Sequence, residues 1–206
     1  TLLLWWMGAP VASLPGQGLV RSVEATARST TIVDIKGRHA FTLAKLERLP
    51  VPLSRMSPHL VGAVIAVEDR RFYSHGGIDP VRIIGAAWVN ARAGRTAQGG
   101  STITQQLARL SFLTPDKTLR RKVQEAVLAV RLERAYTKNE VLELYLNTAY
   151  FGDGLYGVEA ASRGYFDKHA SDLTVAEAAL LAGLLQAPSA YGPRMSAERA
   201  FARRDV

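Results

Sequence analysis

The sequence predicts a mainly α-helical domain with a short β hairpin near its N-terminus. Two observations carry this prediction. Capping residues recur along the chain, most of them followed by Pro or, three residues later, by Glu, and these patterns mark helix starts. Between residues 57 and 188, apolar residues also recur at the spacing of one helix face. The 206 residues, 48% of them hydrophobic, are enough to bury a core.

The first 28 residues are interpreted as the end of a transmembrane anchor and a linker. Leu2–Met7 is apolar and contains two tryptophans, which is typical of a membrane span ending at the lipid–water interface. Because a span needs about 20 residues, we expect the rest of that helix to precede Thr1. A buried N-terminal helix or a truncated signal peptide is the alternative. Residues 8–28 contain the Pro and Gly typical of a linker.

Residues 29–206 are predicted to form one domain, which begins with the hairpin. Short β-rich runs at 30–35 and 40–43 flank Lys36-Gly37, which can form a turn. Helices are then expected at 58–67, 80–92, 102–112 and 117–134, from 138 onward, and from 175 to before Pro188. Residues 196–204 begin another helix without a cap at its end, so we expect the natural chain to continue past Val206.

Two of these helices carry patterns that predict which face is buried. Residues 60–67 are apolar on every side, so this helix is expected to be buried throughout. In the helix at 117–134, the stripe predicted to face the core consists of Leu119, Val123, Ala126, Val127 and Val130. Arg121, Lys122 and Glu125 would then lie on the opposite face.

Charge and composition limit the kinds of partner. The net charge of +8 favours anions such as nucleic acid, lipid headgroups or phosphorylated substrates. The absence of Cys excludes disulfides and Cys-based zinc sites. The four His are not spaced as metal ligands, and the sequence has neither a phosphate-binding P-loop nor an RNA-binding aromatic motif. We therefore expect no nucleic-acid partner.

Glu68 is a candidate catalytic base because it stands where an apolar helix ends. A carboxylate there meets the negative end of the helix dipole, and partial burial adds to the cost of its charged form. Both effects favour proton uptake. The alternative is that Glu68 and Asp69 only solvate a helix end beside Arg70 and Arg71.

Two further segments carry polar groups suited to an anion. Gly99-Gly100 opens a helix whose free N–H groups can hold one, although a flexible loop with a Ser or Thr cap is the alternative. Arg121, Lys122 and Glu125 lie within about two helical turns of each other. They form either a surface ion pair, worth about 0.3–0.5 kcal/mol, or a cationic site for a phosphorylated leaving group.

Five segments, in order, resemble the motifs of the peptidoglycan glycosyltransferase family. Residues 68–77 resemble the first motif, Glu-Asp-x-x-Phe-x-x-His-x-Gly, and residues 100–106 resemble the second. Residues 121–125 are similar to the third motif, Arg-Lys-x-x-Glu. Residues 138–147 and 178–188 look like the fourth and fifth, and residues 151–161 fit the family as well.

The resemblance implies a lysozyme-like glycosyltransferase head with a small membrane-associated jaw lobe. It implies a hexosyltransferase that polymerises lipid II into β-1,4-linked glycan strands with inversion and releases polyprenyl diphosphate. The domain would lie on the outer face of the cytoplasmic membrane, held by a single-pass anchor. Residues 186–191 look like the class A penicillin-binding proteins, so a transpeptidase domain is expected outside this chain. The implied partners are lipid II, the growing glycan strand, the bilayer and other cell-wall synthesis proteins.

The motifs also imply roles for individual residues. Glu68 would take the proton of the acceptor hydroxyl, and Glu125 would be a second catalytic carboxylate that orients or balances the cations. Substrate binding is implied for Asp69, Phe72, His75, Ser101, Thr102, Gln105, Gln106, Arg109, Arg121 and Lys122. Arg109 stands where family members often have Lys, which keeps the charge but changes its geometry. The resemblance is compatible with a divalent cation, Mg2+ or Mn2+, bound with the diphosphate, and implies no organic cofactor.

Two rival functions remain at the sequence level. A lytic glycosidase of lysozyme type would use one acidic residue in a similar fold, but hydrolysis has no diphosphate for the Arg-Lys-x-x-Glu cluster to bind. A degenerate, non-enzymatic family member that only binds lipid II would be expected to lack Glu68, Glu125 or the Gln pair, and all of these are present.

Overall fold

The computed structural model describes residues 14, 30–33, 39–43, 49–94, 99–114, 116 and 118–188. The predicted end of the membrane anchor, nearly all of the linker and the helix expected at 196–204 lie outside these residues. Within the described residues, no helix has both the length and the apolar character needed to cross a membrane. The chain divides into a first unit, residues 1–23 and 69–145, and a second unit, residues 24–68 and 146–206.

The described part of the chain is mainly helical, as predicted, and it includes a two-stranded sheet. β1 (Thr30–Val33) pairs antiparallel with β2 (His39–Leu43). Thr30 lies opposite Leu43, and the register shifts between Ile32 and Val33. The strands lie where the sequence analysis placed the hairpin.

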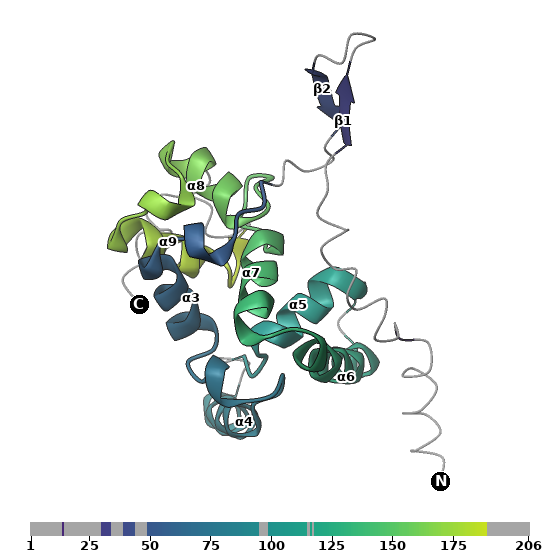
Figure 1. Ribbon diagram of the computed structural model, residues 1–206. Coiled ribbons are helices and arrows are strands. Elements are labelled where there is room, and N and C mark those ends of the chain that lie inside the picture. The colour runs from purple at the N-terminus through teal and green to yellow at the C-terminus, as the bar shows by residue number, and fades with distance from the viewer. Residues whose placement is uncertain are drawn as a thin grey trace. The chain divides into compact units, whose positions relative to one another are not determined.

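Helix α4 (Pro80–Ala93) of the first unit (Figure 1) begins where predicted and ends one residue later than predicted. The carboxylate of Asp79 accepts a hydrogen bond of 3.0 Å from the backbone N–H of Arg82, which caps the first turn. Gly94 follows the last residue with a φ of 61°, a left-handed conformation that glycine adopts without strain.

Helices α5 (Ile103–Phe112) and α6 (Leu119–Ala135) pack against each other in the first unit. α5 starts after Thr102, one of the two residues expected to cap it, and Thr102 and Gln105 form a capping box in which each accepts a backbone N–H of the other. Thr118 caps α6, which begins at Leu119, two residues later than predicted. These caps fix where the second and third motifs begin.

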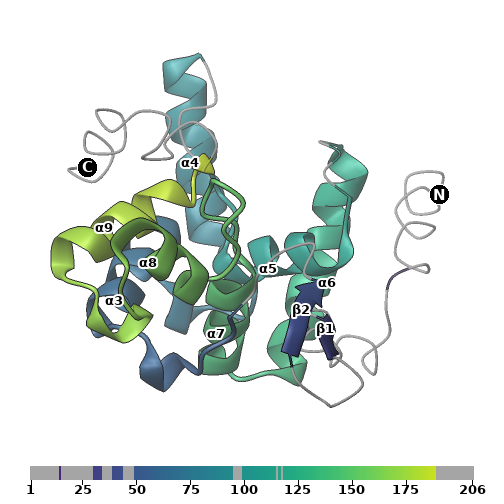
Figure 2. The same ribbon diagram turned by 90° about the horizontal axis from the view of Figure 1, so that it is seen from above.

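The second unit is organised around α3 (Pro58–Glu68) and α9 (Val175–Leu184), which pack side by side (Figure 2). α9 begins with the predicted capping box of Thr174 and Glu177. The helix α7 (Lys138–Thr148) runs from the first unit into the second and also begins where predicted. The second unit further contains α8 (Val158–Phe166) and the short 3-10 helices η2 (Leu53–Arg55) and η4 (Ala170–Asp172).

The prediction that α3 is buried on all sides is wrong. Its buried residues are Leu60, Val64 and Glu68, which follow one another at intervals of four and therefore share one face. Val67 is 40% exposed, although it is apolar. The buried face of α3 thus ends in the carboxylate of Glu68.

The predicted buried stripe of α6 is also wrong. Leu119, the first residue of that stripe, is 69% exposed. The residues that are buried on this helix are Glu125, Leu128, Ala129 and Leu132. Glu125 therefore lies on the core face of α6, where the sequence analysis had expected it on the opposite one.

A buried carboxylate also connects α8 to η4 in the second unit. Glu159 accepts hydrogen bonds from the Ala170 backbone N–H at 2.8 Å, His169 at 2.9 Å and Arg163 at 2.7 Å. Burial alone would raise the pKa of Glu159, but these three donors outweigh it and lower the pKa.

Candidate functional site

Glu68 is the last residue of α3 and is 8% exposed. The predicted base therefore lies at a helix end, as expected, with its side chain on the same face as Val64. The Glu68 carboxylate is thus largely removed from water. Glu68 belongs to the second unit, and the other predicted site residues belong to the first.

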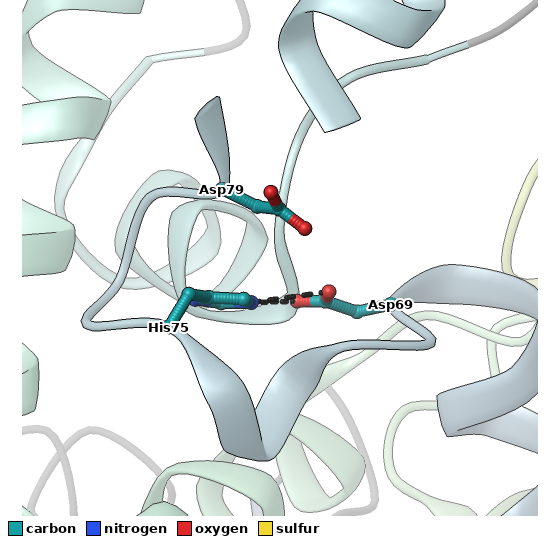
Figure 3. Close-up of side chains that lie close together, drawn as sticks. All are labelled: Asp69, His75 and Asp79. Carbon is teal, nitrogen blue, oxygen red and sulfur yellow. Dashed lines mark hydrogen bonds and ion pairs between the residues drawn. The ribbon is translucent and has the colours of Figure 1, made fainter. Parts of the chain in front are cut away.

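Within the first motif, the carboxylate of Asp69 is bonded to the ring of His75 (Figure 3). One of its oxygens lies 3.1 Å and the other 3.0 Å from His75 Nε2. Asp69 also accepts a hydrogen bond of 3.1 Å from the backbone N–H of Ile103, the first residue of α5. Asp69 has no exposed area. Its carboxylate thus ties the first motif to the start of the second.

Asp79 lies beside Asp69 and His75, and its carboxylate is bound by an arginine. Arg71 donates to both oxygens, with a distance of 3.0 Å from Nε, and Arg82 donates its backbone N–H. Chiefly through these Arg71 hydrogen bonds, the pKa of Asp79 is lowered to about 2. The same hydrogen bonds with Asp79 raise the pKa of Arg71.

Asp69, His75 and Asp79 are a group whose ligand atoms lie within 4.8 Å of one another, close enough to suggest a metal site (Figure 3). The hydrogen bonds that these residues already form do not fit a metal site. The carboxylate of Asp79 is already neutralised by a guanidinium group, and that of Asp69 accepts donors from His75 and the start of α5. A cation there would have to displace Arg71. We therefore assign these residues a supporting role.

Phe72 lies in the short 3-10 helix η3 (Phe72–Ser74) and is fully buried. Its ring is edge-on to that of Tyr73, with the centroids 5.2 Å apart. Lys138 Nζ lies over the ring, 4.4 Å from its centroid. The aromatic residue of the first motif is thus a packing residue in this structure, without a surface open to solvent.

Gly77 closes the first motif against α6. Its φ is +88°, and a Cβ atom added there would lie 2.8 Å from the carbonyl oxygen of Ala129. The carbonyl of Gly77 accepts a hydrogen bond of 2.6 Å from Thr102 Oγ1. Only glycine allows this close approach of two backbones.

The third motif forms a clamp of charges around Glu125, which is 2% exposed. Arg121 Nη1 donates to one carboxylate oxygen, and Lys122 Nζ donates to the other at 2.7 Å. Lys122 also donates to Ser101 Oγ at 2.6 Å. Two cations face one carboxylate, so the cluster is net positive. We call these four residues, Ser101, Arg121, Lys122 and Glu125, the cation cluster.

Some donors of the cation cluster have no hydrogen-bond partner among the described residues. An ammonium group has three N–H donors, and Lys122 uses two of them on Ser101 and Glu125. Arg121 Nε is buried and has no hydrogen-bond partner among the described residues. A buried donor without a partner is costly, and an anion at the cluster would satisfy it.

The remaining residues of the second motif lie along α5. The side chain of Gln105 takes part in the capping box. The side-chain oxygen of Gln106 accepts a hydrogen bond of 3.0 Å from Tyr145. The amide nitrogen of Gln106 therefore points away from the Tyr145 hydroxyl. Arg109, in the last turn, is half-buried and forms no ion pair within the described part of the chain.

The structure therefore brings together Ser101, Arg121, Lys122 and Glu125, and separately Asp69, His75 and the start of α5. Sequence reasoning missed Asp79, Tyr145 and Glu133 as partners of these residues. Asp79 was recognised only as a helix cap, and Tyr145 lies inside the fourth motif. Glu133 had no local signal, because its partners Thr104 and Lys138 come from two other helices.

Known proteins match most of this chain. A family model described as Transglycosylase matches residues 36–206. Penicillin-binding protein 1A of Aquifex aeolicus is 50% identical over 179 residues, which are 87% of this chain and 25% of that protein. Penicillin-binding protein 1A of Escherichia coli is 53% identical over 159 residues, 77% of this chain and 19% of that protein.

The chain thus spans about a quarter or less of the length of these relatives. A crystal structure of penicillin-binding protein 1A from Haemophilus influenzae matches 87% of this chain and 17% of that chain, with 24% identity and a TM-score of 0.46. The family match covers most of the sequence and every residue assigned above. The chain belongs to the transglycosylase family and is a glycosyltransferase domain of the class A penicillin-binding protein type.

Proposed function

We propose that this domain polymerises lipid II into β-1,4-linked peptidoglycan glycan strands and inverts the anomeric carbon at each transfer. The donor is the growing strand, joined through a diphosphate to a polyprenyl lipid, and the acceptor is lipid II. The observation that carries the proposal is the cation cluster, because a diphosphate leaving group needs positive charge rather than a general acid.

The cation cluster would bind the diphosphate as it leaves. Arg121 Nε and the third N–H of Lys122 are among the unpaired donors, and Glu125 keeps both cations in place. Because the donors are fixed before substrate binds, little reorganisation accompanies the developing charge. Arg109, which follows the second motif on α5 and forms no ion pair among the described residues, is a further candidate for phosphate contact.

Glu68 would act as the base. As the 4-hydroxyl oxygen of the acceptor GlcNAc attacks C1 of the donor MurNAc, its proton passes to the carboxylate of Glu68. The bond from C1 to the phosphate oxygen breaks on the opposite face, and the lipid diphosphate departs with the electron pair. Attack opposite the leaving group gives the β configuration, as in inverting glycosidases.

The supporting residues would hold this machinery rather than touch the sugars. Asp69, Phe72 and His75 face protein atoms, with His75 showing only 5% of its side chain. Ser101 and Gln106, which are partly exposed, would line the donor site from the start of α5, whereas Thr102 and Gln105 are buried in the capping box and would support it. A divalent cation that accompanies the diphosphate stays a prediction, and we derive no step from it.

Membrane contact is proposed for α4. This helix exposes large apolar side chains on the first unit: Val81, Ile83, Ile84, Trp88 and Val89. Arg92 lies over the ring of Trp88, 6.0 Å from its centroid, where a cation suits lipid headgroups. Residues 99–113 are a weaker candidate for lipid contact, because Ile103 and Leu107 are fully buried and Leu110 is the one exposed large apolar residue among those described there.

The length of the relatives supports the wider context of the proposal. A chain that matches a quarter of a penicillin-binding protein leaves room for a membrane anchor and a transpeptidase domain elsewhere in the full protein. The catalytic domain would then act on the outer face of the cytoplasmic membrane, together with other cell-wall synthesis proteins.

The proposal is tested by replacing Glu68 with Gln and supplying fluorescent lipid II. Wild-type protein is expected to form long glycan strands, and Glu68→Gln to lose at least about 99% of the rate, as removal of a general base does. Glu177→Gln, at a surface capping box, is the matched control and should polymerise normally. Near-normal polymerisation by Glu68→Gln would show that another group is the base.

A second measurement separates synthesis from lysis. The protein is incubated with purified cell-wall sacculi, and released muropeptides are analysed. We expect none, because the cation cluster has no leaving diphosphate to bind during hydrolysis. Release of muropeptides together with inactivity on lipid II would favour the lytic glycosidase.

A further inference from the structure

We propose that Lys138 is a positioning residue for glycosyl transfer, acting through the face of the Phe72 ring. This inference rests on the proposed function and extends it to a residue outside the cation cluster. Lys138 stands at the start of α7, in the fourth motif, and its ammonium group closes a ring of contacts through the first, second and fourth motifs.

The contact with Phe72 is a cation–π interaction. Lys138 Nζ lies 4.4 Å from the centroid of the ring, well within the distance at which a ring face attracts a cation. Phe72 is fully buried and the Lys138 side chain is 20% exposed, so little water competes for the charge. Partial desolvation strengthens this attraction.

The other side of the ammonium group is bound to Glu133. Lys138 Nζ donates to Glu133 Oε1 at 2.6 Å, and Thr104 Oγ1 donates to the same oxygen at 2.6 Å. Thr104 is fully buried in the first turn of α5. Lys138 thus reaches α5 through one shared carboxylate on α6.

Asp69 completes the closed set of contacts. The backbone N–H of Phe72 donates to the carbonyl of Asp69 at 2.9 Å. The Asp69 carboxylate accepts from the N–H of Ile103 at 3.1 Å, and Ile103 precedes Thr104 in the chain. Each member therefore has a neighbour on both sides, and such closed polar networks fix geometry more strongly than separate pairs.

This closed set of contacts controls the position of α5. Its first turn follows Ser101, which receives the hydrogen bond from Lys122 in the cation cluster. A shift of the first turn would move Ser101 and the second motif relative to Arg121 and Lys122. Loss of the Lys138–Phe72 contact should therefore lower kcat for transfer, because misplaced groups act on the transition state, with little effect on KM for lipid II.

The test varies the charge distribution of the Phe72 aromatic ring while nearly keeping its size. Phe72 is replaced by phenylalanines that carry one, two or three fluorine atoms, each of which weakens the negative face. We expect log kcat to fall in equal steps, to about one tenth at three fluorines, with KM within about threefold. The control is the same series at Phe151, which is fully buried and has no cation over its ring among the described residues; it should stay flat.

Substitutions of Lys138 complete the test. Lys138→Arg keeps a cation over the ring and should retain most of kcat, whereas Lys138→Met should lower it and should abolish the fluorine dependence. A flat Phe72 series in an active wild-type protein overturns the inference and leaves the proposed function standing. A wild-type protein that cannot polymerise lipid II overturns both.

Discussion

Lys122 Nζ lies 2.6 Å from Ser101 Oγ, across 21 positions of the sequence. The same ammonium group is bound to Glu125, so one cation joins the second motif to the third. We predict that Lys122→Met lowers the initial rate of lipid II polymerisation by about 10²-fold or more, the usual cost of one preorganised electrostatic group. Lys168→Met is the matched control, because Lys168 is equally exposed, at 41%, and also paired with a glutamate.

The cluster should also behave as a unit. Glu125→Gln is expected to lose activity while its melting temperature stays above the assay temperature, and the double variant Lys122→Met with Glu125→Gln should be little worse than either alone. Fully additive losses would contradict a shared role. Loss of activity only through a collapsed melting transition would assign Glu125 to folding.

Gly77→Ala should destabilise the protein by about 2–3 kcal/mol, because the new Cβ meets a rigid backbone at a positive φ. Gly76→Ala is the control: a Cβ there meets nothing within 4 Å, so we expect a change within about 0.5 kcal/mol. Urea unfolding of both variants measures this. Equal stabilities would show that α6 moves freely away from Gly77.

Acid should weaken the start of α4 through Asp79. Its folded-state pKa of about 2 lies below the value near 3.9 of an unfolded chain. The native state therefore binds fewer protons, and the stability that Asp79 adds is complete above about pH 4 and is lost as the pH falls toward 2. Urea unfolding at pH 5 and pH 3 should show a gap between wild type and Asp79→Asn that narrows at the lower pH. A gap of constant size would refute the assignment.

The exposed face of α4 should bind membranes. We expect Ile84→Asp to weaken flotation of the domain with vesicles that contain anionic phospholipid, because a charge replaces a side chain that is 69% exposed. Val175→Asp makes the same change at a residue of similar exposure, 64%, on α9 of the second unit and serves as the control. Equal flotation of both variants would argue for another membrane-facing surface.

Helix starts were predictable because caps are local. The signals at Asp79, Thr102 and Thr174 each involve a side chain and a backbone N–H within three residues, so they survive without any knowledge of packing. α8 went unpredicted because it begins after Gly157, which makes no side-chain cap. Its φ of 82° is imposed by the approach to Asn147, a contact that no local pattern encodes.

The buried faces were less predictable because the residues that carry chemistry break the pattern. Glu125 was taken as solvent-facing on account of its charge, which rotated the expected core stripe of α6 away from Leu128 and Leu132. On α3, an all-apolar run concealed that only Leu60 and Val64 face the core beside Glu68. The closure of contacts around Lys138 also depends on three helices at once, so only the tertiary structure could show it.

The position of Glu68 and Glu125 on the core stripes of their helices has a consequence for protein engineering. A procedure that selects substitutions for thermal stability would treat both as misplaced charges and would replace them with Leu or Met, since a buried carboxylate is usually less favourable than a well-packed apolar side chain. The resulting domain would be more robust and would make no glycan. Stabilised versions of this enzyme should therefore be sought on the exposed sides of α3 and α6, with both acids held fixed.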